Sequence, residues 1–264
     1  MINLSASWAI ALRHIRMWRR DPNFLLGAFY WPLLDILIWG FLGSWIQQSQ
    51  ATQFHNYEMI ALLCVLLWQC VGRASNALIT CFNEELWSHN IVNLFSLPLR
   101  ITDWIVGAII FTGIILSMIS FFCIFVCALL YQISWLQLLS AFCIFALPLF
   151  ICGIWVSFMA LQIIVLLGKR SVELGYVIVW FLLPFSGAYY PIEVLPAWGQ
   201  TISTVIPMSY LFQGMRAYLM YDQNPASYLI TGSVMALVYA SVAILLFVCC
   251  FKYSKHHGLA RLAD

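Results

Sequence analysis

Two charged residues that could pair or handle an ion stand in strongly apolar surroundings, Asp35 and Arg73. If the helix that contains Asp35 begins near Asp21, Asp35 lies roughly 20 Å from that helix end, at 1.5 Å per residue. If the helix that contains Arg73 ends near residue 81, Arg73 lies roughly 13 Å from that end. Both helix ends are expected on the same side of the membrane. These depths place the carboxylate within reach of the guanidinium. Charges buried in lipid mark a partner or a pathway. The residues therefore predict either a structural ion pair between two helices or a polar point on a substrate path.

No other set of residues forms an enzyme motif. The sequence contains no GxxxxGK[ST] nucleotide loop, no HExxH and no GxSxG. Glu84 and Glu85 are adjacent, so on a helix they point in different directions and make no acid–base pair. The nine cysteines lie in apolar runs without a CxxC pair, which indicates packing residues rather than disulfides or a zinc site. We expect no catalytic activity, no metal, no cofactor bound by this chain and no nucleic-acid partner.

Composition indicates that lipid solvates most of the chain. Of its 264 residues 64% are hydrophobic and 8% charged, with a mean hydropathy of +0.93, whereas soluble domains carry roughly 25% charged residues. Between Trp104 and Gly168 no Asp, Glu, Lys, Arg or His occurs. A span takes roughly 20 apolar residues, so this stretch holds two. We predict an all-α membrane protein with a single domain over residues 1–264.

About six spans are expected. Asp21-Pro22 and Asn224-Pro225 each combine a capping residue with a proline suited to the first helical turn. Thr102 or Asp103 could cap the third span. The predicted spans are 23–46, 57–81, 103–130, 135–167, a fifth that starts near Ser171 and is interrupted at Pro184, and 227–251.

The segment 187–224 is apolar but broken by Pro191, Pro196, Gly199, Pro207 and Gly214. Broken helices at membrane depth persist only where protein or water satisfies the freed backbone groups. We therefore expect short re-entrant helices on the outer side. Their predicted outer gate consists of Tyr189, Tyr190, Pro191, Glu193, Pro196 and Trp198.

Two further segments are amphipathic. Residues 4–20 place Leu4, Trp8 and Trp18 on one face and Arg13 and Arg16 on the other, which predicts a helix lying in the headgroup layer; the alternative is a basic flank of the first span. Residues 83–99 are too polar to span. They read as a connector with an apolar stripe of Trp87, Ile91, Leu94, Phe95 and Pro98, and a polar stripe of Glu85, His89, Asn93 and Ser96 free to meet a partner. The alternative is a helix that only terminates the spans.

Charge predicts the orientation. Ten of the twelve Lys and Arg residues fall on one side: Arg13, Arg16, Arg19, Arg20, Arg100, Lys169, Arg170, Lys252, Lys255 and Arg261. The predicted outer loops 47–56 and 131–134 contain none. By the positive-inside rule, both termini and the loops 82–102 and 168–171 are cytoplasmic. The tryptophans mostly fit interfacial belts, although some could face a pathway and stack on sugar rings or lipid-linked groups.

Taken together, these segments resemble the ABC-2 type permeases, the membrane subunits of ATP-binding-cassette exporters for polysaccharides, nodulation factors, antibiotics and lipids. The resemblance covers nearly the whole chain and rests on the basic N-terminal helix, on NIVNLFSLPLRITDWIVG (90–107) and on SGAYYPIEVLPAWGQTISTVIPMSYLFQGMR (186–216). Asn93 stands where many relatives carry glutamate.

The resemblance implies a permease of the bacterial inner membrane that moves a lipid-linked, glycan or amphiphilic substrate outward. It implies a second permease copy or paralogue with the pathway between them, surrounding membrane lipids, and a separate cytoplasmic ATPase dimer that binds ATP and Mg. The connector would be the coupling helix, with Glu84, Glu85, Trp87, His89 and Asn93 at the ATPase.

Two other readings remain open. A secondary transporter or channel that works without ATP would need membrane-embedded carboxylates and often inverted repeats, and the sequence offers Asp35 and no visible repeat. An intramembrane enzyme would need converging polar residues, but Asp103, Glu173 and Glu193 share neither one side nor a motif.

Overall fold

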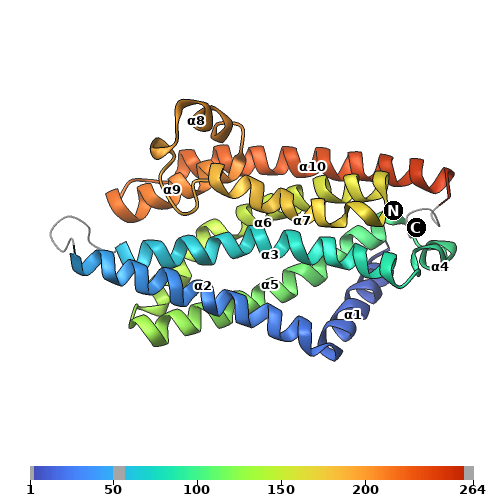
Figure 1. Cartoon of the computed structure of the whole chain (residues 1–264), viewed down its shortest axis with the longest axis horizontal. Helices are drawn as coiled ribbons and strands as arrows, with labels where there is room; N and C mark the ends of the chain where they lie inside the picture. The colour runs from blue at the N-terminus through green and yellow to red at the C-terminus, as the bar shows by residue number, and fades with distance from the viewer. Residues whose placement is uncertain (1–2, 50–56, 259–264) are drawn as a thin grey trace.

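The computed structural model describes residues 3–49 and 57–258, and every regular element in that part of the chain is helical. Five described helices are long and apolar enough to cross a membrane. They are α2 (Pro22–Ser49), α3 (Tyr57–Trp87), α5 (Ile101–Tyr131), α6 (Trp135–Leu167) and α10 (Ala226–His256), and they run side by side as an elongated bundle (Figure 1). The predicted all-α membrane class is confirmed.

The fifth predicted span is the short one. After the 3₁₀ turn η1 (Lys169–Ser171), helix α7 (Val172–Leu182) is followed by the 3₁₀ turn η2 (Leu183–Phe185), which contains Pro184. Proline lacks the backbone N–H that continues a helix, and its ring clashes with the preceding turn. The break at Pro184 is therefore confirmed. Together α7 and η2 are roughly 20 Å long, less than the roughly 30 Å apolar core of a bilayer.

Local capping explains where several helices begin. The Asp21 carboxylate accepts a hydrogen bond from the Asn23 backbone N–H at 2.8 Å, and the Asn224 amide oxygen accepts one from Ala226 at 3.0 Å. For α5 the residue at the N-cap position is Arg100 rather than Thr102 or Asp103, but Asp103 takes part in the cap as the N3 residue of a capping box. Asp103 lies in the first turn, where its carboxylate accepts from the backbone N–H of Asn3 at 2.8 Å and of Arg100 at 3.4 Å.

Helix α3 forms the centre of the bundle. It packs against α2, α5 and α6, and 78% of its most apolar stretch is buried, compared with 22% for α2 and 28% for α10. The helices around it therefore present apolar side chains outward, to lipid. Gly153 of α6 allows close approach to α3, because a Cβ there would meet the Val71 carbonyl oxygen at 2.9 Å. Small residues commonly allow such contacts between membrane helices.

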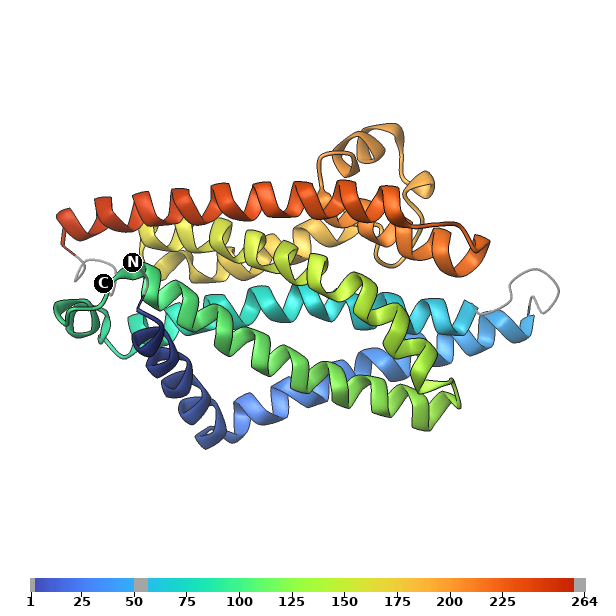
Figure 2. The same cartoon turned by 180° about the vertical axis from the view of Figure 1, so that it is seen from behind.

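The two ends of the bundle differ. One end, hereafter the α4 end, gathers α4 (Ile91–Ser96), the start of α1 (Leu4–Arg20), the start of α5 and the last turns of α10 (Figures 1 and 2). The opposite end, hereafter the α8 end, carries α8 (Ala197–Ser203). The start of α1 and the end of α10 meet at the α4 end. Helix α7 with η2 runs back from the α4 end without the length of a full crossing, so the described residues contain five full-length spans where about six were predicted.

The cations predicted to share one side lie in elements that meet at the α4 end: α1, the start of α5, η1 and the end of α10. Arg261 lies outside the described residues, as does most of the predicted outer loop 47–56. Of the two exceptions, Arg73 lies within α3. Arg216 is buried, and its Nη2 donates to the Ala188 carbonyl at 2.9 Å.

Residues 4–20 form an amphipathic helix, α1, whose predicted apolar anchors Leu4 and Trp8 are exposed and free to meet lipid. In addition, α1 packs on α5 and buries Ser7, Ile10, Ala11 and His14. Gly107 of α5 makes this contact close, because a Cβ there would lie 2.5 Å from the Ser7 carbonyl oxygen.

The segment 187–224 forms short helices, as predicted. They are η3 (Ile192–Val194), α8 and α9 (Pro207–Tyr221). Helix α9 packs on α10 and α6, which fixes the α8 end to the bundle.

Candidate functional site

At the polar centre of the bundle, three side chains on α2 and α3 are linked in series by hydrogen bonds. Gln69 Nε2 donates to Asp35 Oδ2 at 2.8 Å, and Arg73 Nε donates to Gln69 Oε1 at 3.0 Å. Arg73 Nη1 also donates to the Gly27 carbonyl at 3.3 Å. The predicted direct contact of Asp35 with Arg73 is therefore wrong, because Gln69 stands between them. Its amide has both the donor and the acceptor that this position requires.

Two cavities meet beside these side chains, and both are lined by Trp31, Arg73 and Asn76. The inner cavity, about 270 Å³, lies among α1, α2, α3 and α5 and extends toward the α4 end as far as Trp18 and Glu84. The middle cavity, about 430 Å³, lies among α2, α3 and α7 and is lined by Asp35, Trp68, Gln69, Gly72, Val179 and Trp180. Arg73 therefore lines both cavities.

A third cavity, the outer cavity of about 160 Å³, lies nearer the α8 end. Its walls include Trp39, Tyr189, Pro191 and Arg216. The Trp39 and Tyr189 rings are stacked, with centroids 4.4 Å apart and planes 10° apart. Burial raises the pKa of the Tyr189 phenol, so Tyr189 stacks as an uncharged ring.

The six residues predicted as an outer gate do not converge. Tyr189 and Pro191 line the outer cavity, and the Tyr190 hydroxyl donates to the Pro184 carbonyl at 2.9 Å. Glu193, Pro196 and Trp198 are exposed, and Trp198 contacts Phe185 edge-on. The structure thus separates a pair at the cavity from a group on the outer surface, and a gating role stays a prediction.

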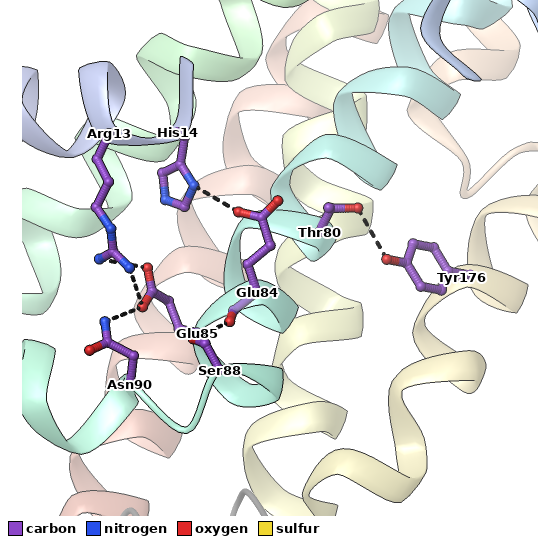
Figure 3. Close-up of polar contacts among 8 residues, drawn as sticks. All are labelled: Arg13, His14, Thr80, Glu84, Glu85, Ser88, Asn90 and Tyr176. Atoms are coloured by element: carbon purple, nitrogen blue, oxygen red, sulfur yellow. Dashed lines mark hydrogen bonds and ion pairs between the residues drawn. The ribbon is translucent and has the colours of Figure 1, made fainter. Parts of the chain in front are cut away.

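At the α4 end, α1 is joined to α3 by two acid–base contacts (Figure 3). The side chain of Glu85 is 1% exposed, and its Oε2 accepts from Arg13 Nη2 at 3.0 Å and from Asn90 Nδ2 at 2.8 Å. Arg13 Nη1 lies 2.9 Å from the other carboxylate oxygen. The adjacent Glu84 contacts His14 Nδ1 at 3.2 Å. The two carboxylates point apart, as expected, but both are held by α1.

The predicted connector 83–99 is not one helix. Helix α3 continues to Trp87, His89 has a left-handed backbone (φ 51°), and α4 begins at Ile91. Glu84 and Glu85 therefore belong to α3. Of the predicted polar stripe, Glu85 is not free because it is buried against α1, whereas His89, Asn93 and Ser96 are exposed. We call residues 87–96 the corner.

At the corner, Ile91, Leu94 and Phe95 of the predicted apolar stripe are buried, but Trp87 and Pro98 of the same stripe are exposed, as are His89 and Asn93. The Lys169 ammonium lies 3.8 Å above the Trp87 ring.

Sequence reasoning missed several residues that organise these sites. Gln69 could have been found, since an amide in an apolar run four residues before Arg73 shares its helix face. No sequence signal links Arg13 to Glu85 or His14 to Glu84. Tyr176 was also missed: its hydroxyl lies 3.1 Å from both the Thr80 hydroxyl and Asn83 Nδ2, joining α7 to α3.

Comparison with curated proteins found no match. A family model described as ABC-2 type transporter matches residues 5–220, a range that runs from α1 into α9 and includes the polar centre, the three cavities and the corner. Since the match spans most of a chain whose described elements are all helical, this membrane permease belongs to the ABC-2 type transporter family.

Proposed function

We propose that the chain is the permease subunit of an ATP-driven exporter that carries a lipid-linked, glycan or amphiphilic substrate from the cytoplasmic side outward. The family supports transport. The sequence has no GxxxxGK[ST] loop, so a separate ATPase dimer would bind ATP and Mg²⁺.

The observation that carries the proposal is the succession of three cavities along α2 and α3. On α3 their walls pass from Glu84 to Arg73 and on to Cys64, and on α2 from Phe24 through Asp35 to Trp39. The cavities thus follow one another from the α4 end toward the α8 end. A path that carries a substrate across a membrane also runs from one end of the helix bundle to the other.

The chemistry of the cavity walls favours an amphiphile. Trp31, Trp68 and Trp180 offer aromatic faces to the middle cavity, while Asp35 and Arg73 offer charged groups to the same space. Aromatic rings pack against apolar chains or sugar faces, and charged groups at membrane depth commonly mark substrate paths. A molecule with a polar head and an apolar part would meet both kinds of surface.

The α4 end would face the cytoplasm of a bacterial cell, with both termini inside, because the Lys and Arg residues gather there. The whole chain, residues 1–264, would act as one domain. A second copy or paralogue would complete the path.

In this arrangement the corner faces the ATPase. Trp87, His89 and Asn93 are the predicted coupling residues that lie exposed there. The Arg13–Glu85 and His14–Glu84 contacts tie α3 to α1, so force applied at the corner would move both helices together.

The test uses the permease reconstituted with the ATPase that copurifies with it. We expect the His89→Ala/Asn93→Ala double variant to weaken ATPase binding and ATP-driven transport about tenfold, which corresponds to ~1.4 kcal/mol. Its stability should not change, because both side chains are exposed. The matched control, Gln137→Ala/Gln223→Ala, removes two exposed polar side chains elsewhere. Normal coupling in the corner variant, or transport that proceeds without ATP, would contradict the proposal.

A further inference from the structure

Arg216 of α9 is a buried cation, and among the described residues it forms no ion pair. The residue is 8% exposed. Its Nη2 donates to the Ala188 carbonyl at 2.9 Å and lies 3.9 Å from the Cys64 sulfur, and neither of these groups is a carboxylate. The other terminal nitrogen, Nη1, is buried without a hydrogen-bond partner in the described part of the chain. Because arginine stays protonated and an unsatisfied buried donor is unfavourable, Nη1 is available to an acceptor from outside the chain.

The outer cavity, which Arg216 lines, contains no acidic residue among its described walls. The carboxylates on the neighbouring helices α2 and α3 have other partners. Asp35 lines the middle cavity and accepts from Gln69 at 2.8 Å, and Glu58 accepts from the Ser44 hydroxyl at 2.7 Å. The outer cavity therefore has a positive charge in its wall and no negative charge opposite it.

The rest of the outer cavity is mainly apolar. Its walls include the stacked rings of Trp39 and Tyr189 as well as Ile60 and Met220. The volume of about 160 Å³ is far larger than the roughly 10–15 Å³ that one water requires. The cavity therefore admits a group of several heavy atoms, with one charged donor and an apolar surround.

An exposed apolar face of α2 leads to this cavity. Leu42 lines the cavity and is 38% exposed. Ile38 and Trp45 are exposed four residues before it and three residues after it, so the three side chains share one helix face. Because α2 is long and apolar enough to cross a membrane, an apolar tail can lie along this face while its head occupies the cavity.

We propose that the outer cavity binds the acidic headgroup of an amphiphile. An oxyanion oxygen would accept a hydrogen bond from Arg216 Nη1, because ionised donors make short, strong hydrogen bonds to phosphate and carboxylate oxygens, and a guanidinium suits buried ion pairs. The first methylenes of the tail would pack on Trp39. A neutral sugar would supply an acceptor but no charge, and a free inorganic anion would leave the apolar walls uncovered.

The inference rests on the proposed function, since the outer cavity is the last of the three cavities along the proposed path, and it adds that the carried amphiphile is acidic. The test measures binding to the purified full-length chain without an ATPase. Loss of binding at the outer cavity and loss of coupling at the corner are therefore separate results.

The experiment compares dodecyl phosphate with dodecyl glucoside, which has the same tail and an uncharged head, by native mass spectrometry over a concentration series. We expect the wild-type chain to bind one dodecyl phosphate about tenfold more tightly than dodecyl glucoside, because the head of the first is ionised. Inorganic phosphate at the same concentration should not displace dodecyl phosphate, because it lacks the tail that packs on the apolar walls.

Two variants test the location of the site. Arg216→Gln removes the charge and should abolish the preference for dodecyl phosphate. Ala61→Leu fills the cavity from its α3 wall and keeps the Arg216 contacts, so it should weaken dodecyl phosphate binding by about the same factor even if Arg216→Gln does not fold. The matched control is Arg16→Gln, which removes one exposed guanidinium from the α4 end and should bind as the wild type does.

Four results would overturn the proposal. Equal binding of both amphiphiles by the wild type would show that the site does not select an acidic head. Unchanged binding in folded Arg216→Gln or in Ala61→Leu would place the ligand outside the outer cavity. An equal loss in Arg16→Gln would indicate attraction to total charge, and displacement by inorganic phosphate would assign the cavity to a free anion.

Discussion

Arg73 shows how this bundle accommodates a cation at membrane depth. Among the described residues no carboxylate lies within ion-pair distance of it, and its bonds go to an amide oxygen and a backbone carbonyl. The neutral amide of Gln69 connects the Asp35 carboxylate to the Arg73 guanidinium through two charge-assisted hydrogen bonds. This leaves part of Arg73 facing the inner and middle cavities, where a direct ion pair would have occupied it.

The relay predicts that Gln69 matters for stability. Gln69→Leu replaces the polar amide with an apolar side chain of similar size, which removes a donor from Asp35 and an acceptor from Arg73. Leaving buried polar groups unsatisfied costs about 1–3 kcal/mol, and we expect the free energy of unfolding, measured by titration with sodium dodecyl sulfate, to fall by that amount. Gln137→Leu, at an exposed position, is the control and should have no effect. An equal response of both variants would show that the relay contributes nothing.

At the scale of elements, the contact between α1 and α3 places a buried carboxylate opposite a partly exposed guanidinium. Arg13→Ala would leave Glu85 buried with Asn90 as its remaining side-chain partner. We expect the free energy of unfolding to fall by about 1–3 kcal/mol, and the Arg13→Ala/Glu85→Ala double variant to recover part of that loss.

Arg16→Ala is the matched control, because Arg16 is exposed on the same helix. If removing Arg13 costs no more than removing Arg16, the ion pair does not hold α1 in place.

The turn after η2 depends on a second local feature. Gly187 has φ +68°, and a Cβ there would lie 3.1 Å from Ile192 Cγ1. A left-handed backbone costs an L-residue roughly 1–2 kcal/mol, so Gly187→Ala should destabilise the protein by about that amount and speed hydrogen exchange in residues 186–195. Gly27→Ala, in a helix with no heavy atom within 4 Å of the new Cβ, should be neutral or stabilising. Similar exchange rates in both variants would argue against strain at this turn.

At the scale of the whole molecule, the concentration of cations at one end predicts the orientation in the membrane. In a background without the native cysteines, a cysteine replacing Ser96 should react with an impermeant maleimide only from the cytoplasmic side. A cysteine replacing Ala226 should react only from outside, because α10 begins at the opposite end and both positions are exposed. The reverse pattern, or labelling of both positions from one side, would refute the predicted topology.

The sequence by itself determined the features that depend on neighbours along the chain. Asp21-Pro22 and Asn224-Pro225 start helices because the cap and the proline act within one turn, and Pro184 ends a helix because its missing N–H acts on the preceding turn. Apolar runs longer than a bilayer crossing identified the long helices in the same way, since lipid requires each helix to satisfy its own backbone.

Only the tertiary structure decided which side chains meet. Arg13 and Glu85 are 72 residues apart, and nothing in either segment signals that α1 turns back onto the end of α3. Depth along two helices brought Asp35 near Arg73, but the rotation of those helices placed Gln69 between them. The same holds for the six outer residues, of which Tyr189 and Pro191 line a cavity while Glu193, Pro196 and Trp198 face outward. The helical period determines which residues share one face of a helix. Which residues of two helices are in contact depends on how the helices are rotated and packed against each other.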